Sequence, residues 1–92
     1  MRDLNELRIE IDSIDSQLIQ LFEKRMDIVK EVIEYKLSHD MPIYQSDREK
    51  EVLKKNLSKV ENKELIQYAS MFLENMMHIS KSYQSDIKDK KI

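Results

Sequence analysis

The sequence LNELRIEIDSIDSQLIQLFEKRMDIVKEVIEYK, residues 4–36, decides the fold. Its apolar residues recur at spacings of three and four, which places them on one face of a helix; they are Leu4, Leu7, Ile11, Ile14, Leu18, Leu21, Ile28 and Val32. No Gly or Pro precedes Pro42, so we expect one uninterrupted helix of about 50 Å. Two cations, Arg25 and Lys36, occupy positions on this face where an apolar residue is expected.

Two shorter helices are expected after this one. Pro42 cannot continue a helix, and Ser46 with Glu49 has the pattern of a capping box, which predicts a second helix of roughly 13 residues beginning at Ser46. Asn62 is the expected cap of a medium-length third helix. The charged tail at 86–92 is expected to be frayed. The sequence therefore predicts an all-α fold with one long, one short and one medium helix.

The composition limits the class of protein. A chain of 92 residues with 37% charged residues and no Gly is typical of one helical domain, which we expect to span 1–92. The net charge of −2 gives no general attraction to nucleic acid or to an anionic membrane, and no apolar run approaches the ~20 residues that span a bilayer. The chain has no Cys, which suits the cytoplasm. We expect a cytoplasmic protein with no nucleic-acid or membrane partner.

The unequal helix lengths favour a partner subunit. The second helix covers only about 20 Å of the first and the third about 30 Å, so the N-terminal half of the long helix has little cover within one chain. The same helix of a second copy, packed antiparallel in an intertwined homodimer, would bury its apolar face. A compact three-helix monomer is the alternative.

Three cations are predicted to lie near one another. Arg25 and Lys36 point toward the middle of the apolar face, and Arg48 follows at the start of the second helix. A buried unpaired cation costs several kcal/mol, so each requires an anion. Long side chains can also reach solvent from the edge of a helix face. Spacing alone leaves open whether a small anionic ligand or internal carboxylates such as Glu49 neutralise these cations.

Two polar residues of the third helix favour a ligand. Ser80 and Gln84 are four residues apart and continue its apolar face, so both side chains are expected to project inward. A Ser hydroxyl can bond to its own helix, whereas a core-facing Gln requires another polar partner. Together with the cations, they predict a pocket for a small molecule that bears carboxylates. His39 and His78 have no second ligand at reliable spacing, so we expect no metal site.

Several short motifs occur in a specific order along the chain. They are LRIEIDSID at 7–15, KR at 24–25, YK at 35–36, Pro42-Ile43, DRE at 47–49, and finally Ser80 and Gln84. No single motif is specific, but the ordered set resembles the all-helical (AroQ-class, type II) chorismate mutases. The resemblance covers about residues 4–84.

The resemblance implies a homodimeric isomerase without a cofactor that converts chorismate to prephenate for phenylalanine and tyrosine biosynthesis. Arg25 and Arg48, with Arg8 from the partner subunit, match the arginines that hold the two substrate carboxylates. Lys36 and Gln84 match the donors to the ether oxygen. The remaining matches are Glu49 at the substrate hydroxyl and Ser80 beside a carboxylate. A partner enzyme of the aromatic pathway is a further expectation from the resemblance.

One position departs from the family pattern. Gln45 stands where related enzymes often carry Asp, which puts recognition of the substrate hydroxyl in question if that contact uses the carboxylate. Glu49 also occupies the capping-box position, so capping and substrate contact compete for its side chain. An isochorismate pyruvate-lyase of the same fold is the nearest alternative function. A non-catalytic regulatory or dimerisation domain is the alternative from another class.

Overall fold

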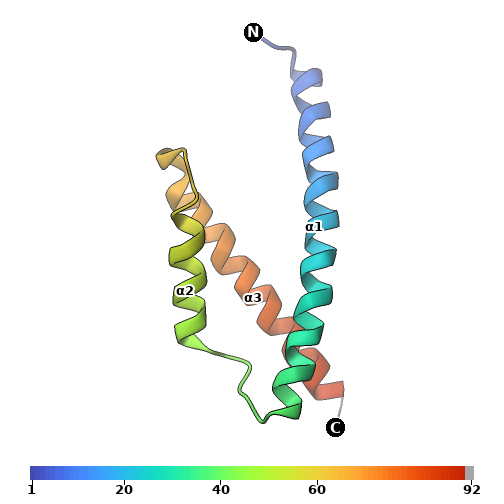
Figure 1. The fold of residues 1–92 in the computed structure, drawn as a ribbon. Helices are drawn as coiled ribbons and strands as arrows, with labels where there is room; N and C mark the ends of the chain where they lie inside the picture. The colour runs from blue at the N-terminus through green and yellow to red at the C-terminus, as the bar shows by residue number, and fades with distance from the viewer. Residues whose placement is uncertain (91–92) are drawn as a thin grey trace.

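The computed structural model describes residues 1–90, and these form an all-α fold (Figure 1). The elements are α1 (Leu4–Ser38), α2 (Ser46–Leu57), a 3₁₀ turn η1 (Lys63–Leu65) and α3 (Ile66–Lys90). The long, short and medium helices predicted from the sequence are therefore confirmed. The last two residues of the predicted frayed tail lie outside the described residues.

The long helix α1 is uninterrupted over its 35 residues. The Asp3 side chain caps its first turn by accepting a hydrogen bond from the backbone N–H of Asn5. At the other end Asp40 has a φ of 53°, a left-handed conformation that Asp tolerates better than most residues. The Met41 N–H then donates to the Lys36 carbonyl at 2.9 Å, which closes the last turn. The chain reverses direction there, before Pro42.

The start of α2 differs from the prediction. Ser46 is the first residue of the helix, and Gln45, in an extended conformation, is its N-cap without a side-chain capping bond. The predicted capping box between Ser46 and Glu49 is therefore wrong. The Glu49 carboxylate instead forms an ion pair with Lys81 of α3, because an opposite charge attracts it more strongly than a backbone N–H does.

The third helix is capped as predicted but runs further. The Asn62 side chain accepts a hydrogen bond from the Glu64 N–H at 3.0 Å, and η1 leads directly into α3. The helix continues through Asp86 to Lys90, within the stretch that was expected to be frayed. Lys88 and Lys90 lie in the last turn, where cations interact favourably with the helix dipole.

The third helix holds the fold together. Within residues 1–90, the backbones of α1 and α2 each pack against α3 and not against each other (Figure 1). The buried apolar residues are Val29 and Ile33 of α1 and Leu73 of α3, and only Ile33 has no exposed surface. Sequence periodicity had placed Ile28 and Val32 inside, but they are 59% and 40% exposed. The face of α1 that α3 covers is adjacent to the predicted apolar face.

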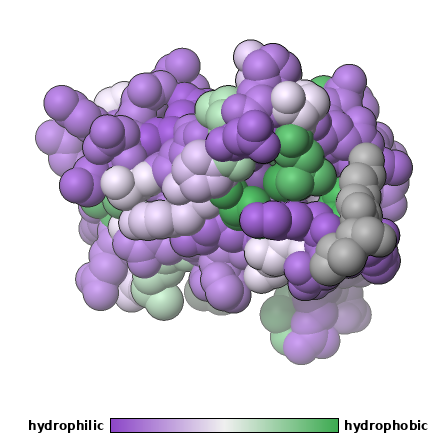
Figure 2. All heavy atoms as spheres, turned by 90° about the horizontal axis from the view of Figure 1, so that it is seen from below, coloured by the Kyte–Doolittle hydropathy of each residue, from purple (hydrophilic) through white to green (hydrophobic). Residues whose placement is uncertain are grey.

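The molecule is long and thin. Its principal extents are 56, 26 and 14 Å, and its radius of gyration is 16.6 Å, compared with about 12 Å for a compact domain of this length. The N-terminal turns of α1 extend beyond the other helices (Figure 1). Figure 2 shows the opposite end, which is mostly hydrophilic around a small hydrophobic area. No helix within residues 1–90 has the length and apolar character needed to cross a bilayer.

Candidate functional site

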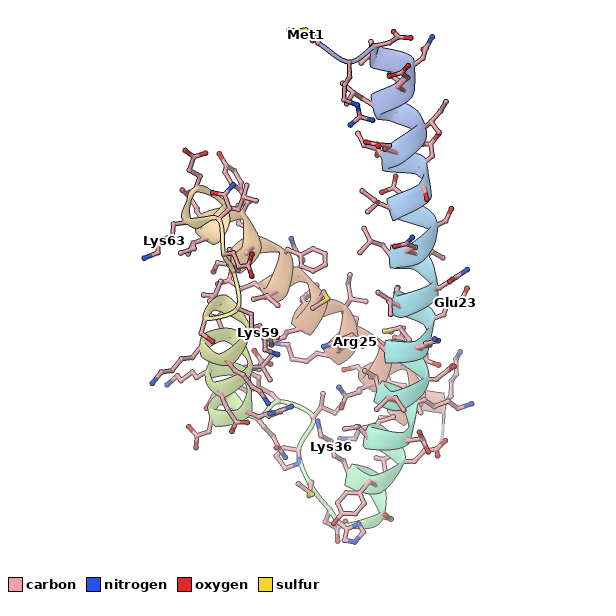
Figure 3. The ribbon with its side chains drawn as sticks, turned by 45° about the horizontal axis from the view of Figure 1, so that its top comes forward. Met1, Glu23, Arg25, Lys36, Lys59 and Lys63 are labelled. Carbon is pink, nitrogen blue, oxygen red and sulfur yellow. The ribbon has the colours of Figure 1, made fainter. Side chains whose placement is uncertain are left out.

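A cavity of about 390 Å³ lies between the C-terminal half of α1, the α1–α2 loop, α2 and α3. Arg25 and Lys36 project from α1 on the side that faces the other helices (Figure 3). Seven of the eight predicted site residues line this cavity, and they are Arg25, Lys36, Gln45, Arg48, Glu49, Ser80 and Gln84. The structure therefore brings together residues that are up to 59 positions apart in the sequence.

Arg25 is held by α3. Its Nη1 donates a hydrogen bond to Ser80 Oγ, and Ser80 Oγ in turn donates to the Met76 carbonyl at 2.9 Å. Ser80 is only 7% exposed, as its position on the apolar face predicted. The Ser hydroxyl uses its single proton on the helix backbone and accepts from Arg25. This chain of bonds fixes one edge of the guanidinium and leaves its other donors available.

Lys36 is held between the loop and α3. Its Nζ donates to the Ile43 carbonyl and to Gln84 Oε1, both at 2.8 Å. Gln84 is 6% exposed, and its Nε2 donates to the Ser80 carbonyl at 3.2 Å. Burial lowers the pKa of Lys36 below its usual 10.5, and the nearby Glu49 carboxylate opposes this shift. An ammonium group with three hydrogens thus has two of them bonded to uncharged oxygens.

The first two turns of α2 contribute charge of both signs. The Arg48 guanidinium pairs with Glu51 on the exposed side of the helix. An exposed pair of this kind contributes about 1 kcal/mol or less, so a ligand carboxylate can replace Glu51 at little cost. Gln45 is half-buried at the head of the helix, and its carbonyl accepts from the Glu49 N–H at 3.1 Å. Arg48 and Glu49 therefore approach the cavity from one helix terminus.

Arg8 does not belong to this cavity. It lies in the N-terminal half of α1, which the other two helices leave uncovered, and it is exposed. The sequence had placed Arg8 about 25 Å along the helix from Arg25, too far to share a small ligand within one chain. The structure agrees with this separation.

Sequence reasoning missed two kinds of site residue. One is an apolar wall made by Val29, Val32, Val52 and Met77. The other is Lys81, whose Nζ lies 3.1 Å from Glu49 Oε2 and 4.8 Å from the centre of the Tyr44 ring. Its position directly after Ser80 was the available signal. Its partner Glu49 is 32 residues away, so no local pattern reveals the pair.

The lining residues indicate the kind of ligand that fits. Four cations and one carboxylate lie around a partly apolar cavity, and the volume is within the range of small-molecule sites, about 300–1,000 Å³. Arginine forks and an ammonium group bind carboxylates through charge-assisted hydrogen bonds. The site therefore suits a small molecule with an apolar ring and more than one carboxylate.

Comparison with known proteins relates the chain to one group of enzymes. The sequence model of type II chorismate mutases matches residues 7–85. A T-protein of Haemophilus influenzae is 51% identical over 49 residues, which is 53% of this chain and 13% of that protein. A bifunctional chorismate mutase/prephenate dehydratase of Aquifex aeolicus is 38% identical over 80 residues, 86% of this chain and 21% of that protein.

A second bifunctional chorismate mutase/prephenate dehydratase, from Buchnera aphidicola, is 40% identical over 62 residues, which cover 65% of this chain and 16% of that protein. The chain thus spans about a fifth or less of the length of these curated relatives. No solved structure matches it significantly. The family match extends over nearly the whole chain and includes every residue that lines the cavity. This chain belongs to the type II chorismate mutase family.

Proposed function

We propose that this chain is an isomerase that converts chorismate to prephenate. The observation that carries the proposal is the convergence of Arg25, Lys36 and Arg48 with the buried Ser80–Gln84 pair on one cavity. In this rearrangement the ether C–O bond breaks as a C–C bond forms within the same molecule. The reaction requires no nucleophile and no net proton transfer. A site built from fixed cations and hydrogen-bond donors is therefore sufficient.

The arginines would hold the substrate in a compact, chair-like conformation. Ser80 already orients Arg25, so its remaining N–H groups can donate to one carboxylate. Arg48 would exchange Glu51 for the second carboxylate. Binding both carboxylates holds the two reacting carbons close together, and this lowers the entropic part of the barrier. The apolar wall excludes water from the ring.

Lys36 would stabilise the transition state. Negative charge gathers on the ether oxygen as its bond to carbon breaks, and an ammonium in a partly dry site stabilises that charge more than the neutral ground state. The third hydrogen of the Lys36 ammonium is the one available for this contact. Gln84 would add an uncharged donor after its amide group turns away from the Ser80 carbonyl.

Glu49 would recognise the substrate hydroxyl. Its carboxylate lines the cavity and can accept a hydrogen bond from that group. Its side chain is not used for helix capping, so the competition predicted from the sequence does not arise. Gln45 shares this end of the cavity.

We further propose that the working form is a homodimer in which Arg8 completes the site of the partner subunit. The apolar residues in the N-terminal half of α1 support this, because they are 37–60% exposed in one chain; they are Leu4, Leu7, Ile11, Ile14, Leu18 and Leu21. A second cavity of about 390 Å³ with an apolar lining lies beside Phe22 and Phe72, and Arg25 borders both cavities. The same half of α1 from another copy would bury these surfaces. The cytoplasmic location expected from the sequence stays a prediction.

The test is conversion of chorismate by the purified protein, with the product identified by chromatography. Wild type should produce prephenate, and Lys36→Ala should lose at least about a hundredfold in kcat, the usual cost of removing one electrostatic donor. Lys30→Ala, an exposed change on the same helix, is the matched control and should leave the rate unchanged. Pyruvate from isochorismate without turnover of chorismate would select the lyase. Turnover of neither substrate would overturn catalysis.

A further inference from the structure

We propose that Lys81 is a positioning residue that holds the Glu49 carboxylate away from Lys36 and toward the substrate hydroxyl. The inference rests on the proposed function, since it assigns Glu49 and Lys36 to the same substrate. It concerns a side chain for which the sequence pattern gave no role. Two contacts of Lys81 and the hydrogen bonding of Lys36 carry it.

The first contact joins α3 to α2. Lys81 Nζ lies 3.1 Å from Glu49 Oε2 and 3.4 Å from Glu49 Oε1, so it contacts both carboxylate oxygens. The two side chains are only 33% and 26% exposed. This pair is therefore better shielded from solvent than the Arg48–Glu51 pair, whose side chains are 63% and 64% exposed. A shielded pair with contact to both oxygens restricts the carboxylate more than an exposed one.

The second contact fixes Lys81 itself. Its ammonium lies over the Tyr44 ring, 4.8 Å from the centroid, within the range of a cation–π interaction. Tyr44 belongs to the α1–α2 loop, immediately after Ile43, whose carbonyl accepts from Lys36. Lys81 is thus held between the loop and α2. Any movement of its ammonium would break the contacts with both Tyr44 and Glu49.

The third observation is that Lys36 has one ammonium hydrogen left to donate. Two of its three ammonium hydrogens are bonded to the Ile43 carbonyl and Gln84 Oε1. The Glu49 carboxylate is close enough to raise the pKa of Lys36 against the effect of burial. Without Lys81, the Glu49 carboxylate would be attracted to Lys36. It would then accept a hydrogen bond from the third N–H of the ammonium, which the ether oxygen requires. Lys81 prevents this by neutralising Glu49 first.

Other charged and titratable groups face the same cavity and contribute to its electrostatic potential. They are Arg25, Tyr35 and Lys36 from α1, Tyr44 from the loop, Arg48 and Glu49 from α2, and Lys81 from α3. Removing the Lys81 charge also reduces repulsion felt by Lys36, and this alone would raise the Lys36 pKa. A test must therefore separate direct repulsion from the effect that acts through Glu49.

The first measurement follows the Lys36 ammonium by NMR titration, with its signal assigned by its loss in Lys36→Arg. Lys81→Met keeps the length of the side chain without its charge, and the Lys36 pKa should rise. In a Glu49→Gln background the same substitution should produce a much smaller rise. Lys88→Met, an exposed change later in α3, is the matched control and should leave the titration unchanged. Equal rises with and without Glu49 would overturn the proposal.

The second measurement is the pH profile of kcat/KM with chorismate. Lys81→Met should reduce kcat/KM on the order of tenfold, as expected for a modest displacement of a contacting group, and should move the alkaline limb to higher pH. Lys81→Arg keeps the charge and should recover most of the loss. A purely structural role for the ion pair would lower the melting temperature and move the limb by the same amount in the wild-type and Glu49→Gln backgrounds, which would overturn the proposal.

The two measurements separate this inference from the proposed function. If wild type does not convert chorismate while the Lys36 titration responds through Glu49, the function fails and the positioning role stands. If wild type produces prephenate while Lys81→Met changes neither the titration nor the limb, the positioning role fails and the function stands. Circular dichroism verifies that each variant is folded.

Discussion

Lys36 is the residue on which the proposed chemistry of this site depends. Burial lowers the pKa of its ammonium, and the Glu49 carboxylate opposes this shift as the smaller of the two causes. Desolvation disfavours the charged form, yet the proposed function requires that form. The two carbonyl acceptors and the nearby Glu49 carboxylate favour the charged form and so oppose the effect of burial.

The lowered pKa of Lys36 predicts a specific pH dependence. Activity should be full below this pKa and should fall as the pH rises through it, because the neutral amine cannot stabilise the developing charge. The midpoint should lie below 10.5, the usual value for lysine. The measurement is kcat/KM across the alkaline range.

Lys36→Arg provides the comparison for this profile. A guanidinium stays protonated throughout the range, so the variant should be slower but should lack the alkaline limb. An unchanged limb in Lys36→Arg would assign the titration to another group.

The positions of half of the eight predicted site residues could be predicted from helix geometry alone. Arg25, Lys36, Ser80 and Gln84 each interrupt an apolar face, and a period of 3.6 residues fixes the direction in which each side chain points. Glu49 and Lys81 could not be paired in this way. Their contact depends on how α2 is placed on α3, which is a tertiary property that no local spacing contains.

At the scale of elements, Ile33 anchors the crossing of α1 and α3. Its side chain has no exposed surface, and it lies between the turns that bear Arg25 and Lys36. Packing at this point therefore sets the distance of both cations from Ser80 and Gln84. The same contact stabilises the fold and aligns the site.

Replacing Ile33 by Ala should lower the free energy of unfolding by about 2–5 kcal/mol, the usual cost of a cavity in place of a large buried side chain. Urea denaturation at one fixed protein concentration provides the measurement. Ile9→Ala is the matched control, because Ile9 is 68% exposed and lies opposite the apolar face of α1. It should change the free energy by no more than about 0.5 kcal/mol. Similar losses for both variants would contradict the assigned core.

A helix boundary could be predicted where the capping partner is a few residues away. It could not be predicted where a distant charged residue binds the capping side chain instead. Asn62 was identified as a cap because its partner is two residues away. The Ser46–Glu49 pattern failed because Lys81, distant in sequence, pairs with Glu49. The charged end of α3 stays helical beyond the predicted limit, and its last-turn lysines favour the C-terminus of a helix.

At the scale of the whole molecule, the thin shape means that one chain has little interior. Only Val29, Ile33 and Leu73 are buried apolar residues among those described. The sequence predicted this shortage of cover from helix lengths alone. It could not predict which face of α1 meets α3, because the neighbouring face is nearly as apolar and the choice depends on the partner helix.

The dimer proposal predicts recovery of activity when two inactive variants are mixed. Arg8→Ala and Lys36→Ala chains, unfolded together and refolded in equal amounts, form heterodimers with one intact site. Activity should reach about a quarter of the wild-type value if pairing is random. Each variant alone should stay inactive under the same treatment.

Native mass spectrometry separates the heterodimer, at about twice the 11.1 kDa chain mass, from the two homodimers, because the two substitutions change the chain mass by different amounts. Heterodimer formation without recovered activity would contradict a site shared between subunits.

The central place of α3 has a consequence for synthesis on the ribosome. The chain emerges from its N-terminus, so α1 and α2 leave the exit tunnel before the helix on which both pack. Until residue 66 and its successors appear, α1 lacks the helix on which it packs, and the nascent chain exposes a long amphipathic helix. The three-helix unit can therefore fold only after α3 has left the tunnel, and until then α1 is open to contact with unrelated apolar surfaces.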